Sequence, residues 1–222
     1  MTMDEYFGDW MKVIDRKEVV KVISYLKTIN PNALCPPLKS IFKAFELCPY
    51  RDCKVVFIGQ DPYPHKGIAT GILFGNKRDT KKLSPSLEVI KEAVINPEFP
   101  TSPIPFDITL ESWAQQGILL INSALTVELN RVGSHTMVWR PFIAEFLKNL
   151  SNCNPGIIYV LFGQQAQTFR VYINEHVNTI LTEKHPSYYA RQKERMPSTV
   201  FEKVEKLTKD LYGEPIQFLI SN

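Results

Sequence analysis

The chain has 222 residues, of which 44% are hydrophobic and 22% are charged, so it is long enough to bury a full core and too balanced to be disordered. Its net charge of +3 permits binding to nucleic acid but does not indicate it. No apolar run approaches the roughly 18 residues of a membrane span, and the acidic start lacks the apolar block of a secretion signal. The four cysteines lack the close spacing of zinc ligands, so we expect free thiols and a cytoplasmic protein.

Four short apolar runs predict buried strands, at residues 54–58, 118–122, 157–162 and 179–182. Helical patterns separate them. The clearest covers residues 139–150, where large apolar side chains recur every three or four positions. Strands that alternate with helices predict an α/β protein, with three layers in the order α/β/α and a central four-stranded parallel sheet.

Two further segments bear on the organisation of the chain. Ser84, Pro85 and Glu88 form the pattern of a helix start, with the serine as the capping residue and the glutamate near the capping-box position. The Pro-rich residues 96–105 resemble a linker, but they are short and apolar, and the strand pattern continues beyond them. We therefore expect a surface loop within a single domain that spans residues 1–222.

Polar residues follow each predicted strand, at the edge where open parallel sheets place their chemistry. They are Gln60 and Asp61 after the first strand, Asn122 at the end of the second, Gly163 and Gln164 after the third, and His185 after the fourth. Each has an ordinary structural interpretation, since Asp61 before Pro62 is a common strand exit and His185 fits a loop histidine with one hydrogen bond.

What favours a functional interpretation is that these groups are predicted to converge. An acid, an amide and an imidazole, together with the aromatic side chains of Tyr63 and Phe74, would meet at one edge of the sheet. This combination suits a flat, polar, uncharged ligand such as a nucleobase.

The sequence resembles the family 1 uracil-DNA glycosylases. The similarity rests on residues 59–63 (GQDPY), 119–127 (LLINSALTV) and 185–187 (HPS), in the family's order and at similar separations. Supporting segments are residues 84–87 (SPSL), 113–117 (WAQQG) and 133–135 (GSH). The resemblance implies a DNA-repair enzyme that flips uracil out of DNA, hydrolyses its N-glycosidic bond and leaves an abasic site.

The resemblance also implies a role for each residue of the site. Asp61 would stabilise positive charge on the sugar and orient or deprotonate the attacking water, and a neutral His185 would donate a hydrogen bond to uracil O2. The base-binding residues would be Gln60, Tyr63, Phe74 and Asn122. Among these, Asn122 would pair with O4 and N3–H, Phe74 would stack on the base, and Tyr63 would exclude the methyl group of thymine.

Contacts with DNA are implied for a further set, Ser86, Gly163, Gln164, Ser187, Tyr189, Arg191 and Lys193. The serines and the turn at Gly163 would bind phosphates. Tyr189 stands where most relatives hold an apolar wedge, and we expect it to enter the space that the flipped base vacates; the alternative is a surface tyrosine on a mobile loop. Arg191 and Lys193, with Arg195, would form a basic rim beside it.

Three departures from the family pattern affect the expected binding of DNA and leave the reacting groups in place. Pro64-His65 replaces the usual His-Gly, Ala69-Thr70-Gly71 replaces Ala-His-Gly, and Gly163-Gln164 replaces Gly-Ser. The changes at Pro64-His65 and Gln164 motivate an alternative hypothesis, a non-catalytic DNA-binding or replication-accessory module on the same fold. A small-molecule α/β hydrolase or a nucleotide-binding protein lacks support, because the chain has no GxSxG, Walker or GxGxxG motif.

The expected chemistry needs neither a metal nor an organic cofactor, because side chains supply the required charges. No lysine Schiff base is indicated, so we expect a monofunctional enzyme without lyase activity. The expected partners are uracil-containing DNA, single- or double-stranded, and a protein inhibitor is a further candidate. We expect no membrane association and a monomer.

Overall fold

The computed structural model of the protein describes residues 2–95 and 105–219. Its main sheet has four parallel strands in the order β3-β2-β5-β6. These are β2 (Val55–Gly59), β3 (Ile118–Asn122), β5 (Ile158–Phe162) and β6 (Thr179–Glu183). Each strand begins and ends within one residue of its predicted range, so the predicted α/β class and parallel sheet are confirmed.

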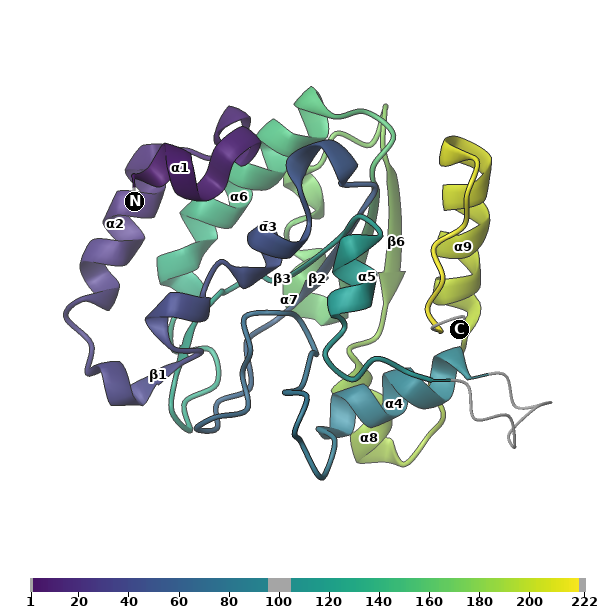
Figure 1. Ribbon diagram of the computed structural model, residues 1–222, viewed down its shortest axis with the longest axis horizontal. Coiled ribbons are helices and arrows are strands. Elements are labelled where there is room, and N and C mark those ends of the chain that lie inside the picture. Colours follow the sequence, from purple (N-terminus) through teal and green to yellow (C-terminus); the bar gives the residue numbers. More distant parts are fainter. Residues whose placement is uncertain (1, 96–104, 220–222) are drawn as a thin grey trace.

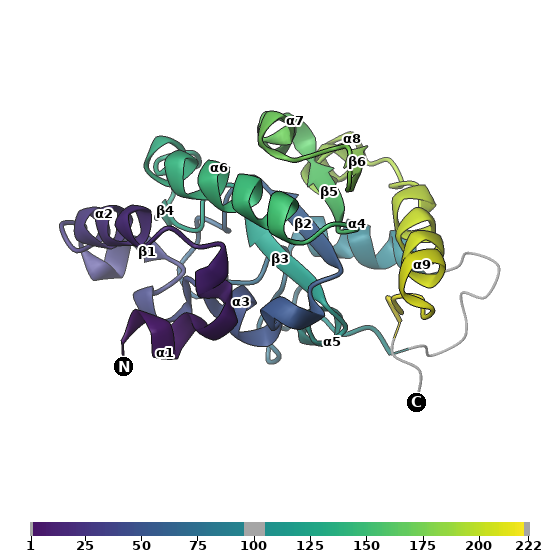
Figure 2. The ribbon, with the colours of Figure 1, turned by 90° about the horizontal axis from the view of Figure 1, so that it is seen from above.

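Helices cover both faces of this sheet, which gives the predicted three layers (Figures 1 and 2). One face packs against α1 (Met3–Phe7), α2 (Arg16–Leu26), α3 (Lys43–Leu47), α6 (Thr136–Cys153) and α7 (Gly163–Gln167). The other packs against α4 (Pro85–Val94), α5 (Glu111–Gln115), α8 (Pro186–Gln192) and α9 (Thr199–Tyr212). Figure 1 shows α1, α2 and α6 on one side of β6 and α9 on the other.

Shorter elements complete the chain. A small antiparallel sheet, which the sequence did not predict, pairs β1 (Leu34–Cys35) with β4 (Val127–Glu128). The 3-10 helices of the described residues are η1 (Gly8–Lys12), η2 (Pro31–Ala33), η3 (Leu38–Ser40), η4 (Tyr50–Asp52) and η5 (Arg170–Tyr172).

Strand β2 shows how the sheet builds two cores. Successive side chains of a strand point to opposite faces. Val56 and Ile58 therefore join the core that contains Trp139 of α6, while Phe57 joins the core that contains Trp113 of α5. Every residue of β2 is buried, which explains why this strand is a continuous apolar run and not an alternating one.

Two helix predictions have different outcomes. The apolar stripe from Trp139 to Leu150 lies within α6 and is at most 1% exposed, as its spacing predicts. Helix α4 begins at Pro85 with Ser84 as its capping residue, but the serine side chain does not cap the helix. The Ser84 hydroxyl instead donates to the Tyr63 hydroxyl, at 2.6 Å, so the capping-box expectation is wrong.

The expected surface loop at residues 96–105 lies outside the described residues except for its last one. Within the described ranges, no helix is long and apolar enough to cross a membrane.

Candidate active site

The site begins where β2 and β3 end side by side. Gly59, the last residue of β2, pairs with Asn122, the last residue of β3. A Cβ atom on Gly59 would lie 2.3 Å from Leu73 Cδ1 and 2.9 Å from Asn122 Oδ1. Glycine is therefore required there for a steric reason, since any side chain would push the Asn122 amide away.

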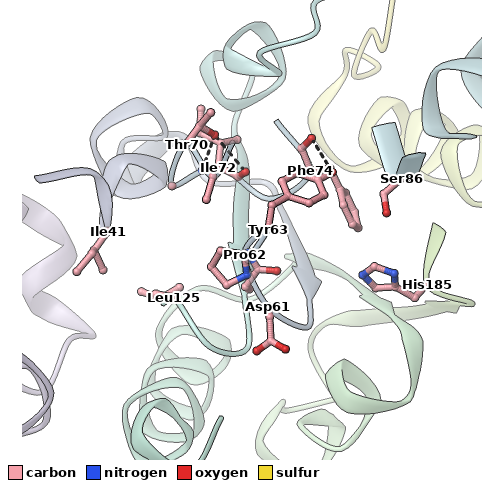
Figure 3. Close-up of a pocket in the computed structure, with 13 residues that line it drawn as sticks. Ile41, Asp61, Pro62, Tyr63, Thr70, Ile72, Phe74, Ser86, Leu125 and His185 are labelled. Carbon is pink, nitrogen blue, oxygen red and sulfur yellow. Dashed lines mark hydrogen bonds between the residues drawn. The ribbon is translucent and has the colours of Figure 1, made fainter. Parts of the chain in front are cut away.

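A pocket opens at this edge of the sheet. Its polar and aromatic lining includes Asp61, Tyr63, Phe74, Ser86, Asn122 and His185. Figure 3 shows Ile41 and Leu125 at one end of the pocket and His185 at the other, with Asp61 between them. The structure thus brings together the acid, amide, imidazole and aromatic side chains that the sequence predicted to converge.

Asp61 has two oxygens in different environments. Its Oδ2 accepts hydrogen bonds from the Gly133 backbone amide at 3.0 Å and from Gln60 Nε2 at 3.1 Å. Its Oδ1 is buried and has no partner within the described residues. Burial raises the pKa of this carboxyl, and the two hydrogen bonds oppose the rise by favouring the anion. One oxygen is fixed, and the other is left to face a ligand or water.

His185 caps the start of α8, and its contacts define its tautomer. The backbone N–H of Ser187 donates to His185 Nδ1 at 3.2 Å, and the Ser187 hydroxyl lies 2.8 Å from the same nitrogen. Because Nδ1 accepts, the proton of the neutral ring belongs on Nε2. Burial, with the charge of Arg191, lowers the pKa of His185 to about 4. The imidazole is therefore a neutral donor at physiological pH.

Two aromatic residues are held beside this ring. Phe74 adopts a left-handed backbone conformation with φ of 62°, which is uncommon for a non-glycine residue and typical of functional sites. Its ring centroid lies 5.5 Å from that of His185. The Tyr63 hydroxyl donates to the Phe74 carbonyl at 3.3 Å and accepts from Ser84. Burial raises the pKa of Tyr63 to about 12, so this side chain stays neutral.

These groups suit a planar, uncharged ring with hydrogen-bonding edges. Asn122 Oδ1 is buried without a partner in the described structure, and a buried unpaired carbonyl oxygen indicates a ligand donor. An imidazole donor, an aromatic side chain and a carboxylate line the same pocket. Within the described ranges, no group of three His, Cys, Asp or Glu side chains is placed to hold a metal ion.

Comparison with known proteins identifies the family. The model of the Uracil DNA glycosylase superfamily matches residues 45–209. A protein of Campylobacter jejuni named uracil-DNA glycosylase is 38% identical to this chain, and the match covers 75% of this chain and 72% of the relative. A protein of Borrelia hermsii with the same name is 34% identical, and the match covers 91% of this chain and 90% of the relative. The chain belongs to the uracil DNA glycosylase superfamily. The resemblance seen in the sequence is confirmed at this level.

Solved structures show the same glycosylase fold. The mimivirus uracil-DNA glycosylase aligns over 98% of this chain and 93% of its own, with a TM-score of 0.74 and 23% identity. A mimivirus UNG variant in complex with UGI aligns with a TM-score of 0.72 and 22% identity.

Most of the residues predicted to bind DNA lie together outside the pocket. Gly163, Gln164, Ser187 and Arg191 line one open groove, which we call the α8 groove. Gln60, which was predicted to bind the base, also lines this groove. Ser86 lies in the pocket itself. The Arg191 guanidinium donates to Ser187 Oγ at 3.1 Å, so it holds a serine that also contacts the imidazole. A Cβ on Gly163 would come within 2.9 Å of His185 Cβ, which explains the glycine.

The three residues of the predicted basic rim are divided between two grooves. Lys193 lines a different groove, with Pro85 and Glu92. Arg195 donates to the carbonyls of Glu92 and Ile95 at 3.0 and 3.2 Å. Its guanidinium therefore binds carbonyls at the end of α4, and its side chain lines the same groove as Lys193 and Tyr189.

Tyr189 is also not the exposed side chain that the sequence led us to expect. It lies in α8, is 6% exposed, and donates to Glu183 Oε1 at 2.7 Å.

His65 is exposed and lines a separate pocket with Pro36 and Lys66.

Sequence reasoning missed the role of Gly133 beyond its place in a supporting motif. A backbone amide leaves no side-chain signal, and only the three-dimensional structure shows that it reaches Asp61. It also missed Ile41, Ile72 and Leu125 in the pocket lining, because apolar side chains in a site have the same pattern as core residues.

Proposed function

We propose that this chain is a monofunctional uracil-DNA glycosylase of family 1, with a single domain over residues 1–222. It hydrolyses the N-glycosidic bond of deoxyuridine in DNA, releases uracil and leaves an abasic site. The observation that carries the proposal is the geometry of one pocket, in which a carboxylate with a free oxygen and a neutral Nε2–H donor line the walls with an unpaired amide oxygen. Membership of the superfamily and the names of the relatives support a hydrolase that acts in DNA repair.

Asp61 acts on the sugar side of the breaking bond. Cleavage builds positive charge on the sugar, and a carboxylate fixed beside it stabilises this charge without reorganisation. The oxygen bonded to Gly133 holds the group in place, and the free Oδ1 orients the attacking water or accepts its proton.

His185 acts on the base. Negative charge collects on uracil O2 as the bond breaks, and the Nε2–H donates a hydrogen bond to it. The lowered pKa of about 4 keeps the ring neutral. Because Nδ1 accepts a hydrogen bond from the Ser187 backbone N–H, the single ring proton is on Nε2.

Asn122 reads the base, because its amide donates to O4 and accepts from N3–H. Cytosine reverses both preferences and would leave buried polar groups unpaired, at about 1–3 kcal/mol each. Phe74 stacks on the ring. Tyr63 excludes thymine by a steric clash with its methyl group. Gln60 belongs to the same base-binding set.

DNA, single- or double-stranded, is the proposed macromolecular substrate. Ser86, Ser187 and the turn at Gly163 and Gln164 bind phosphates next to the flipped nucleotide, and Arg191 and Lys193 add positive charge. The proposal includes no metal or organic cofactor, a monomeric state, and a protein inhibitor as a further partner, which the mimivirus complex with UGI supports. The four free cysteines support a reducing, cytoplasmic setting.

The test is base release from oligonucleotides that carry uracil, thymine, cytosine or 5-hydroxymethyluracil, with abasic sites detected on a gel. We expect release of uracil and none of cytosine or thymine, and a large loss of rate in Asn122→Ala and His185→Ala. An absence of abasic product, or full activity in both variants, contradicts the proposal. Salt-dependent DNA binding without base release would favour the alternative, a non-catalytic DNA-binding or accessory module.

A further inference from the structure

Two adjacent tyrosines of α8 occupy different environments. Tyr189 is 6% exposed, belongs to the core on its side of the sheet, and donates to Glu183 Oε1 at 2.7 Å. Tyr188 is only partly buried and lines the α8 groove. The two rings meet edge to face, with centroids 5.4 Å apart at 90°, so the fixed ring of Tyr189 supports the ring of Tyr188.

The α8 groove continues directly from the pocket. His185 lines both, and Gln60 in the groove precedes Asp61 in the pocket. A DNA strand with one base in the pocket would therefore bring a neighbouring nucleotide to the groove. No acidic side chain is among the described residues that line the groove. Lys184 Nζ lies 4.2 Å from the centroid of the Tyr188 ring, a cation–π contact that adds positive charge beside this ring.

We propose that Tyr188 stacks on the base of the nucleotide next to the flipped one, and that Tyr189 is a positioning residue that holds Tyr188 in the groove through Glu183. This inference rests on the proposed function, because it takes the flipped base to lie in the pocket. Stacking on an aromatic ring does not depend on which base is present, as a repair enzyme requires. Tyr189 could reach DNA only by leaving its core contacts and its bond to Glu183.

The test compares two single-stranded oligonucleotides under single-turnover conditions. One has ordinary nucleotides on both sides of uracil, and the other has tetrahydrofuran residues there, which keep the phosphates and remove the flanking bases. We expect the wild type to release uracil about 5- to 150-fold more slowly from the second. Tyr188→Ala should release uracil from the first oligonucleotide more slowly than the wild type, by a similar factor. The variant should release uracil from both oligonucleotides at the same rate.

Conservative variants and a distant tyrosine provide the controls. Tyr188→Phe keeps the ring and should retain both the rate and the sensitivity. Tyr189→Phe removes only the hydroxyl bond to Glu183 and should reduce the sensitivity in part. Tyr212→Ala should behave as the wild type, because Tyr212 bonds to the Gly156 carbonyl, which precedes β5 at the opposite edge of the sheet.

If the rate of Tyr188→Ala depends on the flanking bases as fully as that of the wild type, the inference is overturned. If this dependence is lost in Tyr189→Ala alone, the stacking belongs to Tyr189. Different results would contradict the proposed function and the stacking by Tyr188. If the wild type releases no uracil from either oligonucleotide, the proposed function fails. The stacking by Tyr188 is then tested by the dissociation constants of the same oligonucleotides, measured by fluorescence anisotropy. Equal affinity of the wild type for both would overturn it.

Discussion

The backbone amide of Gly133 donates a hydrogen bond of 3.0 Å to Oδ2 of Asp61, although 72 residues separate them. Gly133 has a φ of 76°, and the adjacent Ser134 hydroxyl accepts a hydrogen bond from the Glu128 amide at 2.8 Å. The turn is therefore fixed on one side and bonded to the carboxylate on the other. Since a hydrogen bond to the charged form favours it, this turn limits how far burial raises the pKa of Asp61.

Gly133→Ala is expected to move the acid limb of the pH–rate profile to higher pH. A Cβ has room there, because its nearest neighbour would be Thr136 Oγ1 at 3.7 Å, so the strain comes from the positive φ and costs about 1 kcal/mol of unfolding free energy. A shifted turn weakens the bond to Asp61 and lets the pKa of the carboxyl rise further. Uracil release measured across pH gives the shift.

The matched control is Gly213→Ala. Gly213 ends α9 with a φ of 85° and has open space around its Cβ position. It should lose similar stability and keep the wild-type pH profile. An unshifted acid limb in Gly133→Ala would show that the amide does not control the carboxylate.

Asp61→Asn is expected to lower the rate of uracil release by about 10²- to 10⁴-fold, with unfolding free energy at pH 7 unchanged or increased. The physical reason is that Asp61 is a buried carboxylate with one unpartnered oxygen and a raised pKa, so its charge opposes folding. Chemical denaturation and single-turnover kinetics measure the two effects.

Asp107→Asn provides the opposite case. Burial alone would raise the pKa of Asp107, but hydrogen bonds from Thr109 and Ser112 outweigh it and lower the pKa. This carboxylate stabilises the fold when charged, so its replacement should cost about 1–3 kcal/mol and leave activity intact where the variant is folded. A more stable Asp107→Asn together with a less stable Asp61→Asn would contradict both interpretations.

The sequence predicted the sheet and the pocket because both depend on patterns that a chain displays directly. Buried parallel strands are apolar runs, and their carboxyl ends must share one edge. The faces of α8 could not be predicted in the same way. With seven residues, the helix is too short for periodicity to distinguish the buried Tyr189 from Tyr188, and nothing local shows that Arg195 reaches carbonyls about 100 positions earlier.

Gly59→Ala is expected to reduce uracil release through Asn122. The added Cβ would approach Asn122 Oδ1 to 2.9 Å and Leu73 Cδ1 to 2.3 Å, so both side chains must move. A displaced amide pairs poorly with the base, and we expect a loss of about 10- to 100-fold, equivalent to roughly 1.4–2.8 kcal/mol.

A double-mutant cycle tests the cause. In the Asn122→Ala background the amide is already absent, so Gly59→Ala should have a much smaller further effect. Additive losses would indicate that Gly59→Ala acts through the core around Leu73 and not through the amide.

His185→Gln is expected to weaken the dependence of stability on pH. The pKa of His185 in the folded protein is about 4, against an ordinary value of 6.5. Between these values the unfolded chain binds a proton that the folded protein does not, so stability is lost as the pH falls from 6.5 to 4, by up to about 3 kcal/mol. Urea unfolding at several pH values across this window should show a smaller loss in His185→Gln. Parallel curves for the two proteins would count against a buried neutral imidazole.

The position of β6 gives the two reacting groups different local stabilities. Among the described strands, β6 pairs only with β5 and is partly exposed along its length, whereas β2 lies between two neighbours and is fully buried. Asp61 follows β2 and His185 follows β6. Because edges open at a lower free energy than the centre of a sheet, a brief opening of β6 would withdraw the imidazole while the carboxylate stays in place. The folded protein would then alternate between a complete site and one that lacks only its donor to the base.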